Sequence, residues 1–116
     1  MRMPSPPSEF EGATDGIAVF IPDEEPFAGR ILYVNDAFVR MSGYSAEQLV
    51  GHSAMLLAGA RPDFAYVSAA VAAVSQRKSY EAKARKFRPD GTSFDAVVHV
   101  DPFGEERQMI LVQRQV

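Results

Sequence analysis

The sequence YEAKARKFRPDGTSFDAVVHV, residues 80–100, alternates between apolar and polar side chains. A period of two is typical of a β-strand, in which successive side chains point to opposite faces. In the first half the apolar positions are Tyr80, Ala82 and Ala84. Pro89-Asp90-Gly91 then favours a tight reversal, because proline presets φ and glycine accepts a positive φ. The second half alternates again, so the stretch predicts two antiparallel strands joined by a short turn.

Three further strands are predicted outside this hairpin. Apolar runs at residues 16–21 and 30–34 read as strands, and Pro22 ends the first of them. Residues 101–104 form another turn signal, and residues 108–115 then read as the last strand. In that strand Met109, Leu111 and Gln113 are predicted to face one side and Ile110 and Val112 the other.

Helix signals fill the region between residues 35 and 76. Asn35 is a suitable N-cap for a short helix that Gly43 can end in the left-handed conformation. Ser45 and Gln48 fit a capping box, and another short helix follows. Asp63 is a suitable cap for one long helix that runs to about Gln76. Its apolar stripe is predicted to consist of Phe64, Val67, Val71 and Val74.

The order of elements is strand, strand, several helices, then three strands in a meander, which predicts an α+β domain with the helices on one face of an antiparallel sheet. The 116 residues are enough for one domain. We assign residues 14–116 to this domain. Residues 1–13, which contain prolines and serines, are expected to be a loosely ordered leader.

Composition argues against several classes of function. The net charge is −3, so nothing indicates binding to nucleic acid or to an anionic membrane surface. The basic residues Lys83, Arg85, Lys86 and Arg88 cluster, and their alternation favours a solvated strand face over a phosphate-binding patch. No apolar run reaches the roughly 20 residues that span a bilayer, and no signal peptide is evident. With no cysteine, the chain is expected in a reducing cytoplasm.

We predict no catalytic or metal site. No serine, histidine and acid can be grouped into a triad from the sequence, and no glycine-rich phosphate loop follows a strand. The two histidines, His52 and His99, lie apart. His99 is predicted to point away from the strand face that carries Phe94, Ala96 and Val98. The chain is therefore not expected to be an enzyme, and a metal or haem site is not expected either.

Several short motifs resemble the sensory PAS domain family. They are Tyr33-Val34-Asn35-Asp36-Ala37-Phe38, Ser42-Gly43-Tyr44-Ser45, Glu47 with Leu49, Gly51, and Arg88-Pro89-Asp90-Gly91-Thr92. The resemblance covers residues 14–116. It implies a five-stranded antiparallel sheet that cups several helices around a small internal cavity. It also implies a regulatory role, with a partner or output domain that receives the signal.

Within that family the chain looks most similar to the light-oxygen-voltage branch, which binds flavin. Residues 51–58 fall on that branch's motif Gly-x-Asn-Cys-Arg-Phe-Leu-Gln, and Leu111-Val112-Gln113 matches its last strand. The resemblance places Ser53 at the motif asparagine, Ala54 at the photoreactive cysteine, Met55 at a phosphate-binding arginine and Ala58 at the glutamine. It also places Ser68 at a second arginine, and Lys86 and Ala96 at the two asparagines that hold the flavin ring. A thiol adduct needs sulfur, so this chain is not expected to be a flavin photoreceptor of that kind.

Small side chains from separate elements are predicted to converge on the cavity, which either holds a different ligand or has closed to native packing density. An inward Lys86 could meet a carboxylate or phosphate of a ligand, although an end that extends to water is favoured. Gln113 could bind a ligand or satisfy a buried backbone group. The predicted ligand-binding residues are Ala54, Leu57, Ala58, Ala84, Lys86, Ala96, Val98, Leu111 and Gln113; Ala82 is expected to face the same space.

Two functions stay open. The first is a sensor module that binds an unidentified small molecule and signals to an output domain. The second is a ligand-free scaffold for dimerisation or protein contact. The apolar outer face of the last strand needs a cover, either the N-terminal segment with Phe10 or a second chain. A homodimer interface is predicted at Phe10, Ile110 and Val112.

Overall fold

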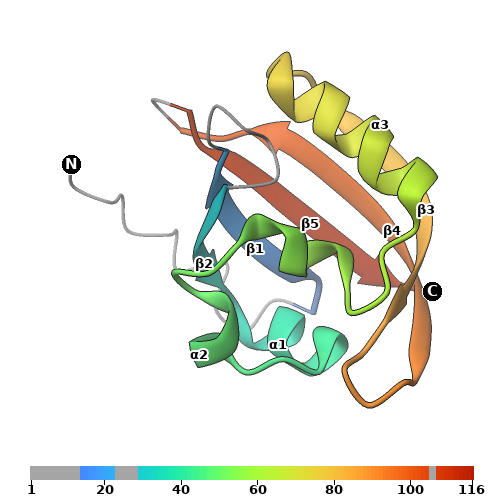
Figure 1. Ribbon diagram of the computed structural model, residues 1–116. Helices are drawn as coiled ribbons and strands as arrows, with labels where there is room; N and C mark the ends of the chain where they lie inside the picture. Colours follow the sequence, from blue (N-terminus) through green and yellow to red (C-terminus); the bar gives the residue numbers. More distant parts are fainter. Residues whose placement is uncertain (1–13, 23–28, 105–106) are drawn as a thin grey trace.

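A computed structural model describes residues 14–22, 29–104 and 107–116. In it, the strands form one five-stranded antiparallel sheet with the order β2-β1-β5-β4-β3. The helical segments lie on one side of this sheet (Figure 1). The predicted α+β class and the five-stranded sheet are confirmed. The prolines of the predicted leader, like Phe10, lie outside the described residues.

The strands follow the predicted runs closely. They are β1 (Gly16–Ile21), β2 (Arg30–Val34), β3 (Tyr80–Phe87), β4 (Ser93–Pro102) and β5 (Met109–Gln115). The hairpin predicted from alternation pairs Ala84 with Ala96 and Lys86 with Phe94. The first strand lies between β2 and β5, so the two ends of the domain meet in the middle of the sheet.

The helical segments are α1 (Asp36–Ser42), α2 (Ala46–Leu49), the 3-10 helix η3 (Ala54–Ala58) and α3 (Phe64–Ser75). The predicted caps are present. Asn35 accepts a hydrogen bond from the Phe38 N–H, Gly43 is left-handed, and Ser45 and Gln48 form the capping box. Asp63 caps α3 through the Tyr66 N–H. Asn35 also accepts from the Ile17 N–H, which ties α1 to β1.

The main core lies between the helices and the inner face of the sheet. It is built on Phe38, Ile31 and Leu49, with Val98, Val100 and Met109 from the neighbouring strands. Val67 and Val74 of α3 are buried as predicted. Phe64 is not, because 85% of it is exposed. It is the first residue of α3, whose first turn lies at the end near the edge strand β3 (Figure 1).

The outer face of the sheet is also apolar. Ile17 and Val19 of β1 pair with Val112 and Ile110 of β5, and alternation turns all four away from the helices. Ile17 and Val19 are buried, whereas Ile110 and Val112 are half-buried. The predicted division of the last strand into two faces is therefore confirmed. Within the described residues, no helix is both long and apolar enough to cross a membrane.

Candidate functional site

The segment that leads into and out of η3 is held to the sheet at both ends. At the first residue of η3, the Ala54 N–H donates to the carbonyl of Gly29, the residue that precedes β2, over 2.7 Å. After it, the Ala60 N–H donates to the Phe87 carbonyl over 2.8 Å. Gly59 allows this approach, since it has φ of 95° and a Cβ there would lie 3.0 Å from the Phe87 oxygen. These contacts fix the height of η3 above the sheet.

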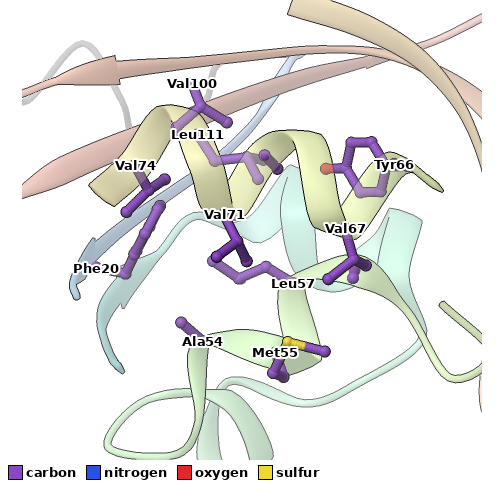
Figure 2. A pocket seen from close by; sticks show the side chains of 12 residues that line it. Phe20, Ala54, Met55, Leu57, Tyr66, Val67, Val71, Val74, Val100 and Leu111 are labelled. Atoms are coloured by element: carbon purple, nitrogen blue, oxygen red, sulfur yellow. The ribbon is translucent and has the colours of Figure 1, made fainter. Parts of the chain in front are cut away.

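An apolar pocket lies between η3, α3 and the inner face of the sheet (Figure 2). Its cavity volume is about 70 Å³. This is smaller than the roughly 300–1,000 Å³ that small-molecule sites usually occupy. The lining side chains come from five elements: Phe20 from β1; Ala54, Met55, Leu57 and Ala58 from η3; Tyr66, Val67, Ala70, Val71 and Val74 from α3; Val100 from β4; and Leu111 from β5.

Lys86 and Gln113 form a buried polar pair beside this pocket. The Lys86 ammonium donates to the Gln113 Oε1 and to the Leu57 carbonyl, both over 2.7 Å. Only 2% of Lys86 and 1% of Gln113 are exposed. The favoured prediction that Lys86 extends to water is therefore wrong. β3 continues past η3, so its inward side chain at this position meets a carbonyl before it can reach solvent.

Burial shifts the pKa of Lys86 and of the neighbouring Tyr66. The pKa of Lys86 falls to about 7, because desolvation disfavours the charged amine. Burial also raises the pKa of Tyr66, whose ring lies 5.6 Å from the Lys86 Nζ. Both hydrogen-bond acceptors of Lys86 are uncharged. A protonated Lys86 is therefore a buried cation without an anionic partner among the described residues.

The predicted site residues divide into two groups. Ala54, Leu57, Ala58 and Leu111 line the pocket. The other predicted positions lie outside the lining and are buried in the core or in the polar pair: Ala84, Lys86, Ala96, Val98 and Gln113. Ala82, which was expected to face the same space, is half-buried on β3.

The pocket wall that α3 forms was not predicted from the sequence. Tyr66, Ala70 and Val71 all line the pocket, as does Val67. The apolar stripe of the long helix was visible in the sequence, and it indicated a buried face. It could not distinguish a face packed on the sheet from one that borders a pocket, because both need the same side chains.

Comparison with known proteins agrees with this architecture. A family model described as "PAS domain" matches residues 15–114. The chain belongs to the PAS domain family. The PAS domain is 31% identical over 91 residues to blue-light-activated histidine kinase 1 of Erythrobacter litoralis, covering 78% of this chain and 25% of that protein. It is 26% identical over 92 residues to a blue-light photoreceptor of Listeria monocytogenes, covering 79% of this chain and 36% of that protein.

A solved structure of an RNA-binding light-oxygen-voltage receptor is similar over most of the PAS domain. The TM-score is 0.78 at 27% identity, with 93% of this chain and 31% of that chain covered. The chain thus spans about a third or less of two of these relatives. The resemblance to PAS domains of the light-oxygen-voltage branch is confirmed.

The site's residues do not fit a flavin bound as in that branch. Ala54 has no sulfur, Met55 borders the pocket with a thioether, and Ser68 is exposed. Lys86 and Gln113 hydrogen-bond each other, so the side chains expected at the ring's edge already satisfy one another. Flavin phosphate would need charge-assisted donors, and the described lining contains no arginine.

The histidines add no metal site in the described part of the chain. His99 is exposed, as predicted from its strand face, and its Nδ1 lies 3.7 Å from Glu81. His52 is exposed beside η3, where its carbonyl accepts from the Ile31 N–H. Across residues 14–22, 29–104 and 107–116, no three histidine or acidic side chains gather as metal ligands would.

Proposed function

We propose that this PAS domain is a regulatory sensor that binds a small molecule in the pocket between η3 and α3, and performs no chemistry of its own. The observation that carries the proposal is a small apolar pocket beside an incompletely compensated buried cation. Filling such a pocket would change contacts of α3 and η3 with β1, β4 and β5. The signal would pass from the sheet to a partner or output domain.

An output domain is proposed by analogy with the relatives. Two of the proteins named above are described as a histidine kinase and an RNA-binding receptor, and the chain covers only 25% and 31% of them. The position of β5 in the middle of the sheet suits this role, because it contacts the pocket through Leu111 and presents Val112 on the other face.

The protein purified from cells is expected to carry no flavin and to show no light-induced adduct. Ala54 offers no thiol, and Met55 and Ser68 offer no contact for a phosphate. Native mass spectrometry checks for any bound small molecule, and an absorption spectrum before and after blue light checks for flavin. A flavin-like absorption band would contradict the expectation; a non-flavin molecule retained in stoichiometric amount would support the sensor.

The second candidate function is a scaffold that binds no ligand and acts through dimerisation. The half-buried Ile110 and Val112 on the outer sheet face favour it. Ile17 and Val19 of β1 lie on the same face, but they are buried, so the accessible apolar side chains there are those of Ile110 and Val112 on β5. Dimerisation is compatible with either function and is proposed through Ile110 and Val112, with Phe10 as a further contact.

Replacing Val112 with Glu is expected to convert a dimer into monomers. A carboxylate buried without a partner in an apolar contact costs several kcal/mol, enough to weaken dimerisation by about a hundredfold or more. Sedimentation velocity of the parent and the variant measures this. Val50→Glu is the matched control, because Val50 is exposed at the end of α2, on the helical side of the sheet. A parent that is monomeric, or a variant with unchanged association, would contradict the interface.

A further inference from the structure

We propose that the pocket between η3 and α3 binds an uncharged, apolar molecule of a few heavy atoms, the size class that includes xenon and short hydrocarbons. This inference rests on the proposed sensor function and narrows it to one class of ligand by size and polarity. A flavin or a nucleotide is both too large and too polar for this site.

The volume of the cavity limits the size of the ligand. At about 70 Å³, the cavity has roughly half the volume of an engineered protein cavity of ~150 Å³ that binds benzene or xenon. A single water needs only about 10–15 Å³ of such space, so the cavity is larger than the void that one water fills. A molecule of a few heavy atoms therefore fits, and a fused ring system does not.

The lining of the cavity disfavours a polar ligand. Apart from Tyr66, every described lining side chain is a hydrocarbon or the thioether of Met55. Lys86 and Gln113 lie outside the lining and hydrogen-bond each other. A polar molecule would therefore lose its hydration in the cavity without gaining hydrogen bonds. Water is disfavoured for the same reason, since a buried water needs about two to four polar partners, so an apolar molecule has no ordered water to displace.

Hydrogen bonds to the sheet hold the η3 wall of the cavity in place. The N–H groups of Ala54 and Ala60 fix η3 at its two ends. Between them, the Leu57 carbonyl accepts from the Lys86 ammonium over 2.7 Å.

These bonds keep the cavity from closing. The Leu57 side chain lines it from η3, and Val71 lines it from α3 (Figure 2). If η3 moved toward α3 to fill the space, its bonds to the sheet would break and leave buried polar groups unpaired. An apolar occupant instead adds dispersion contacts to both walls without moving them. The contacts of such a molecule are therefore the means by which its presence changes the stability of η3 and α3.

The test uses xenon as the small apolar probe and naphthalene as the large one, and follows the methyl resonances of the protein by NMR. We expect xenon to shift the methyl resonances of Leu57, Val67 and Val71, which line the cavity. Those of Ile110 and Val112, half-buried on the outer face of the sheet, are expected to stay unshifted and serve as the internal control. Naphthalene is expected to leave both sets unshifted.

Two matched variants of α3 locate the binding site. Ala70→Leu is expected to abolish the xenon shifts, because Ala70 lines the cavity and the larger side chain fills it. Ala69→Leu makes the same change at an exposed position of the same helix and is expected to keep them. Both substitutions place a good helix former in α3, so they differ only in where the added side chain lies.

Each result bears on the proposal. Xenon shifts confined to the cavity methyls, kept in Ala69→Leu and lost in Ala70→Leu, support it. Naphthalene binding at the same methyls, or a larger molecule found by native mass spectrometry, overturns the size class and leaves the sensor function standing. Absence of xenon shifts in the folded parent also overturns it, and a ligand-free native mass spectrum would then remove the sensor function as well. If Ala70→Leu fails to fold, the comparison of the cavity methyls with Ile110 and Val112 in the parent decides.

Discussion

Raising the pH from about 7 to about 9.5 is expected to increase the free energy of unfolding by about 3 kcal/mol through Lys86 alone. The pKa of Lys86 falls from 10.5 to about 7 on folding, because the amine is buried. Between these two values the unfolded chain binds a proton that the folded protein lacks. Stability is therefore lowest near and below pH 7 and rises as the pH approaches the unfolded pKa.

Urea unfolding followed by circular dichroism at several pH values measures this slope, and Lys86→Met provides the reference. Methionine keeps a similar length without a titrating group, so the difference between the two slopes isolates Lys86. The upper limit of the pH range is set by Tyr66, whose raised pKa makes the folded state less stable once free tyrosine begins to ionise. Parallel slopes in the parent and the variant would mean that Lys86 is not a buried amine.

A loss of stability in the Lys86→Met variant does not affect the comparison of the two pH slopes. The substitution leaves the Leu57 carbonyl and the Gln113 amide without a donor, which typically costs about 1–3 kcal/mol for each buried group. That cost is independent of pH in this range, so it shifts the curve without changing its slope. The double variant Lys86→Met, Gln113→Leu removes one of the unpaired groups and gives a second reference.

Local chemistry explains why the elements of this fold could be predicted from sequence. The caps at Asn35, Ser45 and Asp63 use a side chain that hydrogen-bonds an N–H three residues away. The β3–β4 hairpin could be predicted from the alternation of apolar and polar residues and from one Pro-Asp-Gly turn. The PAS resemblance then implied that all five strands form one antiparallel sheet, which no local pattern contains, whereas the order of the strands was not predicted.

The candidate site could be predicted only in part, because its decisive contacts are distant in sequence. Lys86 hydrogen-bonds residues 29 and 27 positions away, Leu57 and Gln113. Nothing near residue 86 indicates that a carbonyl of η3 will stand over it. Similarly, Phe64 and Val67 share the spacing of one helical stripe, yet only Val67 is buried, and the spacing alone does not distinguish them.

The alanines also show that positions in the folded core could not be predicted from sequence alone. Five alanines were expected to surround one cavity, but Ala84 and Ala96 are packed into the core, whereas Ala54 and Ala58 line the pocket. The two alternatives proposed from sequence, an open space and a closed one, are thus realised in different parts of the same domain. The part of the predicted cavity beside Lys86 is filled by side chains, and the part between η3 and α3 is the open pocket.

This division predicts opposite outcomes for two enlarging substitutions. Ala96→Phe is expected to destabilise the domain, because Ala96 has no exposed surface and its strand partner Ala84 is buried opposite it. Overpacking typically costs about 1–3 kcal/mol, and sometimes more. For a domain of this size each kcal/mol lowers the melting temperature by about 4–8 °C. We therefore expect a fall of at least about 5 °C by differential scanning calorimetry.

Ala70→Leu is the matched substitution on the open side. Ala70 is half-buried and lines the pocket from α3, so the added side chain enters existing space instead of displacing neighbours. Leucine also has a good helix propensity, which keeps the backbone of α3 unstrained. The melting temperature is expected to stay within a few degrees of the parent, while any small molecule that the parent retains is lost because the pocket no longer has room for it. A similar fall in melting temperature for both variants would mean that the pocket has closed, and the ligand-free scaffold would then be the better account of this PAS domain.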